Sequence, residues 1–313
     1  MEDYPRTQAE FERRFATEEA CRAYLVRLRW PQGFRCPRCG GAKAWPVGPL
    51  FQCAACDRQT SVTAGTIFQD TRTPLTTWFR AMWWVTGLKT GASALGLQRV
   101  LGLGSYQTAW AWLHKLRRAM VRPGREPLSG WVEVDESFVG GRGGAQGRST
   151  ATKALIVVAA EAERRGIGRI RMRRIPDASA ESLQPFISDV IAPGSVVHTD
   201  GWHGYDRVRQ NGYRHKVTLL RGDHELAVAR LPRAHRVVAL LKRWLLGTHQ
   251  GAVRHEHLDY YLDEFTFRFN RRRSRHRGKV FFRLVEQAVV VDPVPYQELV
   301  QHVPRRRRRP HKG

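Results

Sequence analysis

The chain is poor in acidic residues and has no long apolar run. Its 313 residues include 28 aspartates and glutamates against 53 lysines and arginines. Its most membrane-like stretch, residues 81–88, is far shorter than the ~20 apolar residues that a membrane-spanning helix needs. The first residues have no apolar core of the kind found in a signal peptide. We therefore expect a soluble intracellular protein without a membrane partner.

The shortage of acidic residues leaves a formal net charge of +25. A charge of this size favours a polyanionic partner, because lysines and arginines that neutralise phosphates release counterions. A solubilising surface charge or a ribosome-bound protein is the alternative. Because the positive charge is spread over every segment and the chain has ten tryptophans, we expect a nucleic-acid partner.

Cysteine is also scarce, and four of the five cysteines form two Cys-x-x-Cys pairs. The pairs are Cys36-Cys39 and Cys53-Cys56, and Cys21 is isolated. An intracellular protein has little use for a disulfide framework, and a redox site needs only one such pair. Two pairs supply the four thiolates of a closed tetrahedral zinc site, so we predict one structural Zn²⁺. We expect Cys21 to be packed within a helix.

Basic residues surround these cysteines, and we interpret the module as a DNA-binding element, although many zinc ribbons bind protein instead. The residues concerned are Arg35, Arg38, Lys43 and Arg58.

The pattern of apolar and turn residues predicts four segments. They are an N-terminal helix (8–29) plus zinc ribbon in residues 1–68, a helical helix-turn-helix-like DNA-binding domain at 69–125, an α/β domain at 126–292, and a basic disordered tail at 293–313. In the second segment, Gly102–Gly104 separates expected helices at 93–101 and 105–120, an arrangement shared by helix-turn-helix motifs and by ordinary three-helix linkers. The arginine run in the tail is either a solvated chain end or a segment that binds DNA electrostatically.

The third segment contains the patterns of both strands and helices. The expected strands are 131–139, 153–160, 168–175, 195–199 and 214–220, and the expected helices are 180–190, 234–247 and 256–272. Strands followed by late helices predict a mixed sheet flanked by helices.

Two aspartates lie at expected strand ends. Asp135 occurs in Val-Glu-Val-Asp-Glu-Ser, on the face opposite Val132 and Val134, and Asp200 ends a short apolar strand before Gly201. Each alone is a weak signal, because Asp before Gly is usually a turn residue. Cleavage of phosphodiesters is commonly catalysed by two divalent ions ~3.5–4 Å apart, which are held by carboxylates on neighbouring rigid elements. On so basic a chain, the pair predicts a shared metal site for two Mg²⁺ or Mn²⁺ ions.

A third ligand is expected from a late helix. His235 and Lys242 are seven residues apart, so they share one helix face, with the histidine able to bind metal and Lys242 or Arg243 able to hold a phosphate. A histidine at a helix start that only bonds backbone or solvent is the alternative. Rival third ligands are Asp223, Glu225, Glu264 and Asn270.

The order of these motifs resembles that of a known family. After the two cysteine pairs come Asp-Glu-Ser-Phe-Val-Gly-Gly, His-Thr-Asp-Gly, Leu-Leu-Lys-Arg-Trp-Leu-Leu-Gly-Thr-His-Gln-Gly and Tyr-Leu-Asp-Glu-Phe-Thr-Phe-Arg-Phe-Asn-Arg-Arg. This order, over roughly residues 15–290, is similar to that of bacterial and archaeal insertion-sequence transposases of the ISXO type, which have an N-terminal zinc ribbon and a DDE domain.

The resemblance implies a ribonuclease-H-like catalytic fold and metal-dependent DNA strand cleavage and transfer. It also implies double-stranded DNA partners, the terminal inverted repeats and the target, and a cytoplasmic, nucleoid-associated enzyme. Asp135 and Asp200 match the two aspartates of the family, and Lys242 matches its basic residue. His235 falls where many relatives have Glu or Asn. A neutral imidazole lowers the negative charge of the site and suits Mn²⁺ better than Mg²⁺, so the departure marks either a tolerated variant or an inactive enzyme.

The implied reaction needs no covalent protein intermediate, and several bound DNA ends require a dimer or a larger homo-oligomer. The residues expected to follow the phosphates are Arg236, Arg243, Arg271, Arg272 and Arg273. The alternatives are a catalytically inactive DNA-binding regulator derived from such an enzyme and a plain nuclease without strand transfer.

Overall fold

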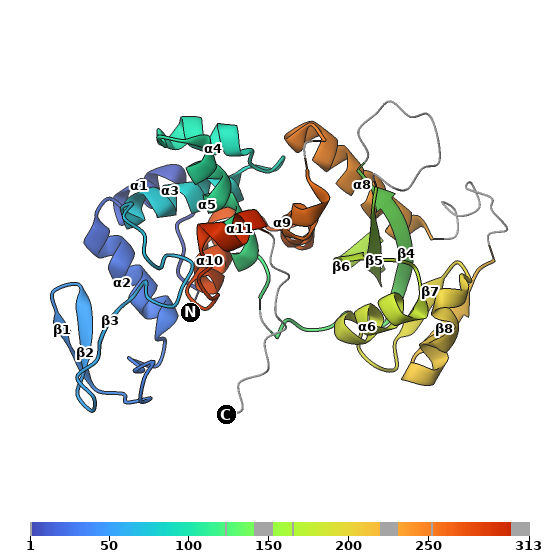
Figure 1. Ribbon diagram of the computed structural model, residues 1–313, viewed down its shortest axis with the longest axis horizontal. Helices are drawn as coiled ribbons and strands as arrows, with labels where there is room; N and C mark the ends of the chain where they lie inside the picture. Colours follow the sequence, from blue (N-terminus) through green and yellow to red (C-terminus); the bar gives the residue numbers. More distant parts are fainter. Residues whose placement is uncertain are drawn as a thin grey trace. The chain divides into compact units, whose positions relative to one another are not determined.

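The computed structural model describes residues 2–122, 124–140, 153–164, 166–219, 231–251 and 253–301. The chain forms two compact units (Figure 1). The first combines Met1–Gly87 and Ala94–Ala119 with the segment that starts at His276, and the second combines Leu88–Ser93 with Met120–Arg275. The domain boundaries expected at residues 68, 125 and 292 stay a prediction.

The first unit contains a small antiparallel sheet and a set of helices. Its elements are α1 (Gln8–Arg14), α2 (Glu18–Arg29), β1 (Ala44–Val47), β2 (Leu50–Cys53), β3 (Gln59–Ser61), α3 (Leu75–Gly87), α4 (Ala94–Leu101), α5 (Tyr106–Ala119), α10 (Arg277–Ala288) and α11 (Tyr296–Gln301). The strands pair in the order β1-β2-β3. α4 packs against α5 across a turn in which Gly102 has a φ of +63°, as the helix–turn–helix pattern predicts.

A single helix over residues 8–29 was the wrong expectation. The chain leaves the helical conformation at Phe15 and begins a new helix after Thr17, whose hydroxyl accepts a hydrogen bond from the backbone N–H of Ala20. Such an N-cap satisfies one of the free N–H groups at a helix start, and here it outweighs the continuous apolar pattern. The break lets Phe11 and Phe15 meet the same partner, the ring of Phe281.

Helix α10 returns the end of the chain to the first unit. It packs against α2, α3 and α5, and its Phe281 is fully buried among aromatic rings. Gly278 is required in this helix, because a Cβ there would collide with the carbonyl oxygen of Pro5. The following helix α11 lies inside the segment expected to be a disordered tail. The expectation of disorder is therefore wrong for residues 296–301. Leu299 is fully buried and holds α11 in place. The arginine run lies outside the described residues.

The second unit is built on a five-stranded mixed sheet. Its elements are β4 (Trp131–Val139), β5 (Ala154–Glu163), β6 (Gly166–Ile175), α6 (Ala180–Val190), β7 (Val196–Thr199), η1 (His203–Asn211), β8 (Arg214–Val217), α8 (Pro232–His249), η2 (His255–His257) and α9 (Leu258–Asn270). The strand order is β6-β5-β4-β7-β8, with antiparallel pairs from β6 to β4 and parallel pairs from β4 to β8. All five expected strands are confirmed, and so is the α/β fold with a mixed sheet of ribonuclease-H-like type.

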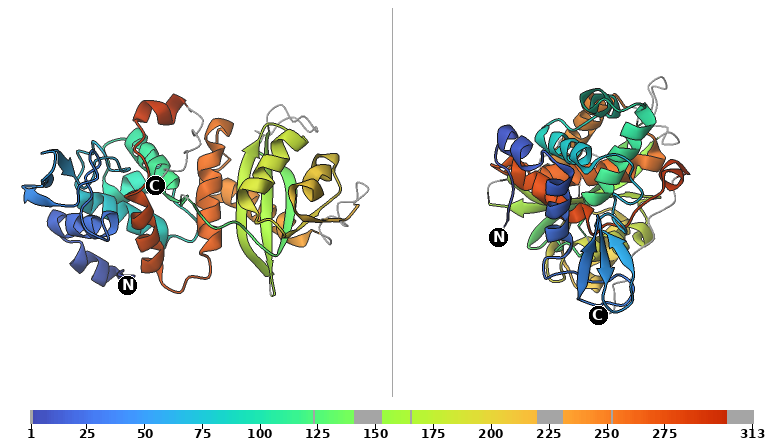
Figure 2. Two further views of the ribbon diagram at one scale, coloured as in Figure 1. Left: turned by 90° about the horizontal axis from the view of Figure 1, so that it is seen from below. Right: turned by 90° about the vertical axis from the view of Figure 1, so that its left-hand side faces the viewer.

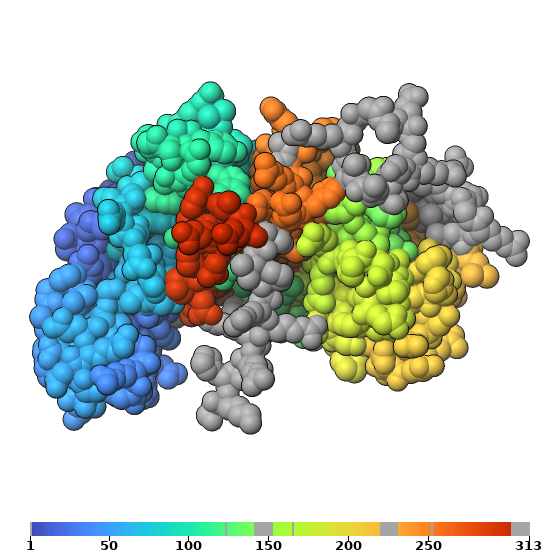
Figure 3. All heavy atoms as spheres, viewed as in Figure 1, coloured from blue at the N-terminus to red at the C-terminus, as the bar shows by residue number. Residues whose placement is uncertain are grey.

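Each face of this sheet is covered by helices. On one face, Val132 and Val134 of β4 join a core cluster with Phe186 of α6 and with Tyr205 and Val208 of η1. Figure 2 shows α6 lying across the sheet, and Figure 3 shows its surface beside that of residues 203–211. On the opposite face, α8 packs against β4 and β5. The alternation of β4 therefore directs Glu133, Asp135 and Ser137 toward α8.

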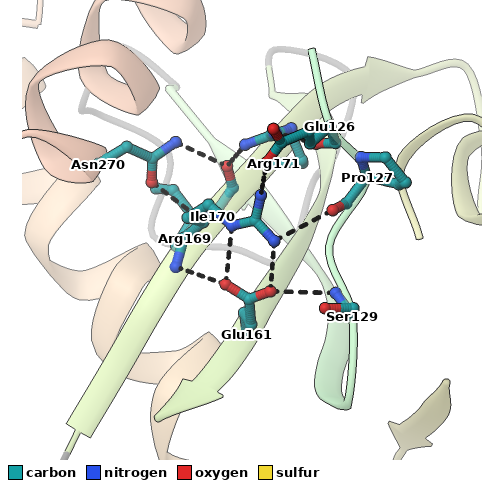
Figure 4. Close-up of polar contacts among 8 residues, drawn as sticks. All are labelled: Glu126, Pro127, Ser129, Glu161, Arg169, Ile170, Arg171 and Asn270. Atoms are coloured by element: carbon teal, nitrogen blue, oxygen red, sulfur yellow. Dashed lines mark hydrogen bonds and ion pairs between the residues drawn. The ribbon is translucent and has the colours of Figure 1, made fainter. Parts of the chain in front are cut away.

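The edge strand β6 is held by polar contacts on both sides (Figure 4). Asn270, the last residue of α9, accepts from the backbone N–H of Ile170 at 2.8 Å and donates to its carbonyl at 3.2 Å. Arg169 binds the Glu161 carboxylate at 2.7 Å, and the same carboxylate accepts from the backbone N–H of Ser129. These contacts fix the segment that leads into β4 and so help to position Asp135.

Candidate metal sites: a cysteine cluster and a carboxylate site

The four paired cysteines converge in the first unit. Their sulfur atoms all lie within 4.8 Å of one another, the one such group of potential metal ligands within the described ranges. The Sγ atoms of Cys36 and Cys56 are 3.7 Å apart, and those of Cys39 and Cys53 are 3.6 Å apart. Four thiolates at the usual Zn–S distance of about 2.3 Å from a tetrahedral ion have this separation. The cluster therefore fits the predicted structural zinc.

Two matching turns build the cluster. In the first, the backbone N–H of Gly40 donates to the carbonyl of Cys36, and in the second Asp57 donates to Cys53, both at 2.9–3.0 Å. Gly40 and Asp57 occupy equivalent positions with positive φ, +74° and +54°. Gly41 is needed for a different reason: a Cβ there would lie 3.3 Å from two of the sulfur atoms. Arg35, Arg38 and Arg58 are exposed around the cluster.

Glu133 fixes the start of α8 against β4. Its carboxylate is almost fully buried and accepts hydrogen bonds from the backbone N–H groups of Arg233 and Ala234 at 2.7 and 3.0 Å. The Arg233 guanidinium pairs with the other oxygen of the same carboxylate at 2.7 Å. A carboxylate at the positive end of a helix dipole is favourable. Because His235 follows directly, this contact sets its position.

Asp135 lies beside two residues of other elements, His235 of α8 and Asp200 after β7. The Nε2 atom of His235 lies 3.6 Å from a carboxylate oxygen of Asp135. Asp200 follows the last residue of β7 and comes level with Asp135 when the parallel register of the two strands is continued. Burial, helped by the carboxylates of Glu136 and Asp200, raises the pKa of Asp135 to about 8. A buried carboxyl whose ionised form is disfavoured by neighbouring carboxylates fits a divalent cation, whose charge would offset that repulsion.

Lys242 lies two turns after His235 and reaches the same strand. Its Nζ donates to the Ser137 hydroxyl at 3.1 Å. Burial and the neighbouring Lys153 lower the pKa of Lys242, while Asp135 opposes the shift. Glu133, Asp135 and Ser137 thus face α8 in sequence order, as the strand periodicity predicts.

Glu136 was not predicted, although its charge helps to raise the pKa of Asp135. It points to the other face of the sheet, where its carboxylate accepts a hydrogen bond from the buried Tyr205 hydroxyl at 2.5 Å. Burial raises its pKa, and the charge of Asp200 adds to the effect. The available signal was its position in the strand: an acidic residue interrupts the apolar series begun by Val132 and Val134.

The rival third ligands have other partners or lie outside the description. Glu264 is buried in α9 and pairs with Arg268 at 2.7 Å. Asn270 uses its amide on β6, which is two strands away from β4. Asp223 and Glu225 lie outside the described residues.

The basic residues expected to bind DNA divide into two groups. Arg236 and Arg243 are exposed on α8. The three arginines after α9 have partners within the protein. Arg271 and Arg272 stack over the rings of Phe267 and Phe269, each at 3.9 Å, and Arg273 pairs with Glu163. A phosphate would have to compete with these contacts.

Comparison with known proteins identifies related sequences for both units. Residues 127–270 match the ISXO2-like transposase domain, and residues 16–59 match the transposase zinc-ribbon domain. A protein of Halobacterium salinarum, described as an uncharacterized protein in transposable element ISH50, is 26% identical over 275 residues, which cover 81% of this chain and 91% of that protein.

None of the described helices is long and apolar enough to cross a membrane. The sheet, the carboxylate site and α8 all fall within the first matched region, and the cysteine cluster falls within the second. The two models together span more than half of the chain and occur in the expected order, so the chain belongs to the ISXO2-like transposase family.

Proposed function

We propose that this transposase binds the terminal inverted repeats of an insertion sequence, cuts DNA at their ends and joins the freed 3′-hydroxyl to target DNA. The observation that carries the proposal is the position of Asp135 on β4, 3.6 Å from His235 of α8 and level with Asp200 at the end of β7. This geometry is what a site for phosphoryl transfer requires: carboxylates on neighbouring rigid elements, with a cation close by.

Asp135 and Asp200 are proposed to hold two Mg²⁺ or Mn²⁺ ions, with His235 as a further ligand through its neutral imidazole. When bound, such ions supply a Lewis acid for the phosphoryl oxygens and lower the pKa of an attacking water. Lys242, whose Nζ donates to the Ser137 hydroxyl, would hold a phosphate. No serine or tyrosine nucleophile is needed, because the attacking groups are water and the DNA 3′-hydroxyl.

The remaining parts of the chain are proposed to bind and arrange DNA. The zinc ribbon, with Arg35, Arg38 and Arg58 exposed, and the α4–α5 pair would bind the terminal repeats. Arg236 and Arg243 on α8 would follow the phosphates near the carboxylate site. Two ends must be held together for joining, so we propose a dimer or a larger assembly, working in the cytoplasm at the nucleoid.

In vitro strand transfer tests the proposal. Full-length protein is mixed with labelled DNA carrying the repeats that flank the gene, a supercoiled target, and Mg²⁺ or Mn²⁺. Asp135→Asn should abolish cleavage and joining while leaving repeat binding intact, and His235→Ala should weaken both steps. Asp189→Asn is the matched control, because Asp189 lies on α6 and pairs with Arg173.

A catalytically inactive regulator is the second candidate, favoured by the histidine at the third ligand position. It predicts tight repeat binding without nicking in either metal. Cleavage that persists in Asp135→Asn would contradict the proposed catalytic site, and cleavage without joining would indicate a plain nuclease.

A further inference from the structure

The two aspartates of the proposed catalytic site lie where the pairing between their strands has ended. The last partners in the parallel register of β4 and β7 are Glu133 and His198, and no later register between these strands occurs among the described residues. Asp135 and Asp200 are the residues two positions further along each segment. The backbone hydrogen bonds between the two strands therefore do not set the distance between the two carboxylates.

Each aspartate is held instead from the side away from the other. β4 stays paired with β5 as far as Val139, so Asp135 is held opposite Val158. β7 stays paired with β8 as far as Thr199, which lies opposite Val217. The sheet thus has an opening in its backbone pairing between β4 and the end of β7, and the proposed metal ligands lie on its two sides.

A side-chain hydrogen bond crosses this opening on the α6 face of the sheet. The hydroxyl of Tyr205 donates to the carboxylate of Glu136 at 2.5 Å. Glu136 follows Asp135 directly, and Tyr205 comes five residues after Asp200. The Tyr205 side chain is fully buried in the core cluster on this face. The bond therefore joins the two chain segments that carry the aspartates.

The electrostatics of Tyr205 agree with a position close to both segments. Burial, together with the charges of Glu136, Asp135 and Asp200, raises the pKa of the Tyr205 hydroxyl well above its ordinary value. The hydroxyl therefore stays protonated and is the donor, and the Glu136 carboxylate is the acceptor.

The short segment between Asp200 and Tyr205 is fixed by its own hydrogen bonds. The backbone N–H of Trp202 donates to the Asp200 carboxylate, and the backbone N–H of Tyr205 donates to the Trp202 carbonyl, both at 3.0 Å. The Trp202 indole N–H donates to the Ala178 carbonyl at 2.7 Å. Gly204 has no room for a side chain, because a Cβ there would collide with the same carbonyl oxygen. The position of the Tyr205 ring is therefore transmitted to the Asp200 carboxylate.

We propose that Tyr205 is a positioning residue for the metal-dependent reaction. Its hydrogen bond to Glu136 holds the segments of Asp135 and Asp200 together across the opening, so that both carboxylates can bind the same divalent ions. The inference rests on the proposed function and adds to it two residues that are not themselves proposed as ligands. Replacing a residue that orients metal ligands typically lowers metal affinity by about 10- to 100-fold. Because Tyr205 acts through Glu136, we expect the lower end of this range.

Direct binding of Mn²⁺ tests the proposal without requiring cleavage. Full-length, zinc-loaded protein is titrated with Mn²⁺, the electron paramagnetic resonance signal of the free ion gives the affinity, and Asp135→Asn identifies the carboxylate site. Tyr205→Phe removes only the hydroxyl and should weaken this affinity about tenfold. Binding to repeat DNA without divalent metal should not change. Cleavage should need a correspondingly higher Mn²⁺ concentration, with a much smaller effect on the rate at saturating Mn²⁺.

Tyr213→Phe is the matched control. Tyr213 belongs to the same core cluster, and its hydroxyl also makes a buried hydrogen bond, to the Ile191 carbonyl at 3.0 Å. That bond does not connect the segments of Asp135 and Asp200, so its loss should leave the Mn²⁺ affinity unchanged. Circular dichroism and urea unfolding establish that both variants are folded under the conditions of the titration.

A double-mutant cycle tests whether Tyr205 acts through Glu136. Glu136→Met removes the acceptor and its charge with a side chain of similar length, and it should weaken Mn²⁺ binding at least as much as Tyr205→Phe does. Adding Tyr205→Phe to Glu136→Met should then weaken binding no further, because the two residues act through one contact. Additive losses would overturn this route.

The outcomes separate this inference from the proposed function. Equal Mn²⁺ affinity in Tyr205→Phe and Tyr213→Phe, with binding lost in Asp135→Asn, overturns the positioning role and leaves the proposed metal site standing. Mn²⁺ affinity and cleavage that are unchanged in Asp135→Asn overturn the proposed catalytic site, and the inference with it. A loss specific to Tyr205→Phe, together with a non-additive cycle, supports the inference.

Discussion

Arg233 binds one carboxylate twice, giving both its backbone N–H and its guanidinium to Glu133 at 2.7 Å. The pair joins the start of α8 to the middle of β4, two residues from Asp135 and two from His235. Glu133 is 1% exposed, so its charge depends on these partners rather than on water. The contact links the stability of the second unit to the geometry of its carboxylate site.

Glu133→Gln should destabilise the second unit by about 1–3 kcal/mol, because a buried hydrogen bond between charged groups is replaced by a weaker one. Urea unfolding followed by fluorescence measures the change. Glu126→Gln is the control: Glu126 is 80% exposed and pairs with Arg169 at 3.5 Å, so its loss should change stability by less than about 0.5 kcal/mol. Equal effects of the two changes would contradict the structural role assigned to Glu133.

Gly41→Ala should lower the affinity for zinc by about tenfold, because the added methyl group presses on the sulfur atoms of Cys39 and Cys53. Competition with a chromophoric chelator measures the affinity, and the thiolate-to-metal absorption of the Co²⁺ form reports the geometry. Gly104→Ala adds the same methyl group where nothing lies within 4 Å, and it should leave both readouts unchanged. An unaltered Co²⁺ spectrum in Gly41→Ala would contradict the close packing around the cluster.

Thiol titration should separate four cysteines from the fifth. In the zinc-loaded protein no thiol should react rapidly with a disulfide reagent at pH 8, and after chelation four should react. Burial, with the charge of Glu18, raises the pKa of Cys21 to about 12, and the side chain is fully buried, so it should react only on unfolding. Five reactive thiols in the folded, chelated protein would refute this assignment.

Acidification should weaken the second unit through Glu161. Burial alone would raise the pKa of this carboxyl, but the hydrogen bonds from Arg169 and from the backbone of Ser129 lower it below its usual 4.5. A depressed folded pKa adds stability above the unfolded value, and this is lost as the pH falls through the folded pKa.

Glu161→Gln should therefore cost about 1–3 kcal/mol near neutral pH and progressively less below about pH 4, where the wild-type carboxyl is protonated as well. Urea unfolding at a series of pH values measures the difference. A difference that is independent of pH would mean that Glu161 acts through packing and not through its charge.

The local pattern of apolar and turn residues was sufficient to predict much of the secondary structure of the second unit. The strand 131–139 and the helix 180–190 were predicted with the bounds that the structure has, because apolar periodicity and the surrounding turns agree there. The same alternation predicted that Asp135 and Val134 face opposite sides. Where a local cap competed with periodicity, at Thr17, the prediction failed.

The sequence alone determined the two cysteine pairs of the cluster, the strands, the basic character and the family resemblance, because each depends on the identity and spacing of residues close together in the chain. Tertiary structure decided what long-range packing controls. It returned α10 to the first unit, buried Glu133 under α8 and joined Glu136 to Tyr205. Residues 69 to 270 positions apart meet in these contacts, from Glu136 with Tyr205 to Phe11 with Phe281, and no periodicity along the chain encodes which of them will face each other.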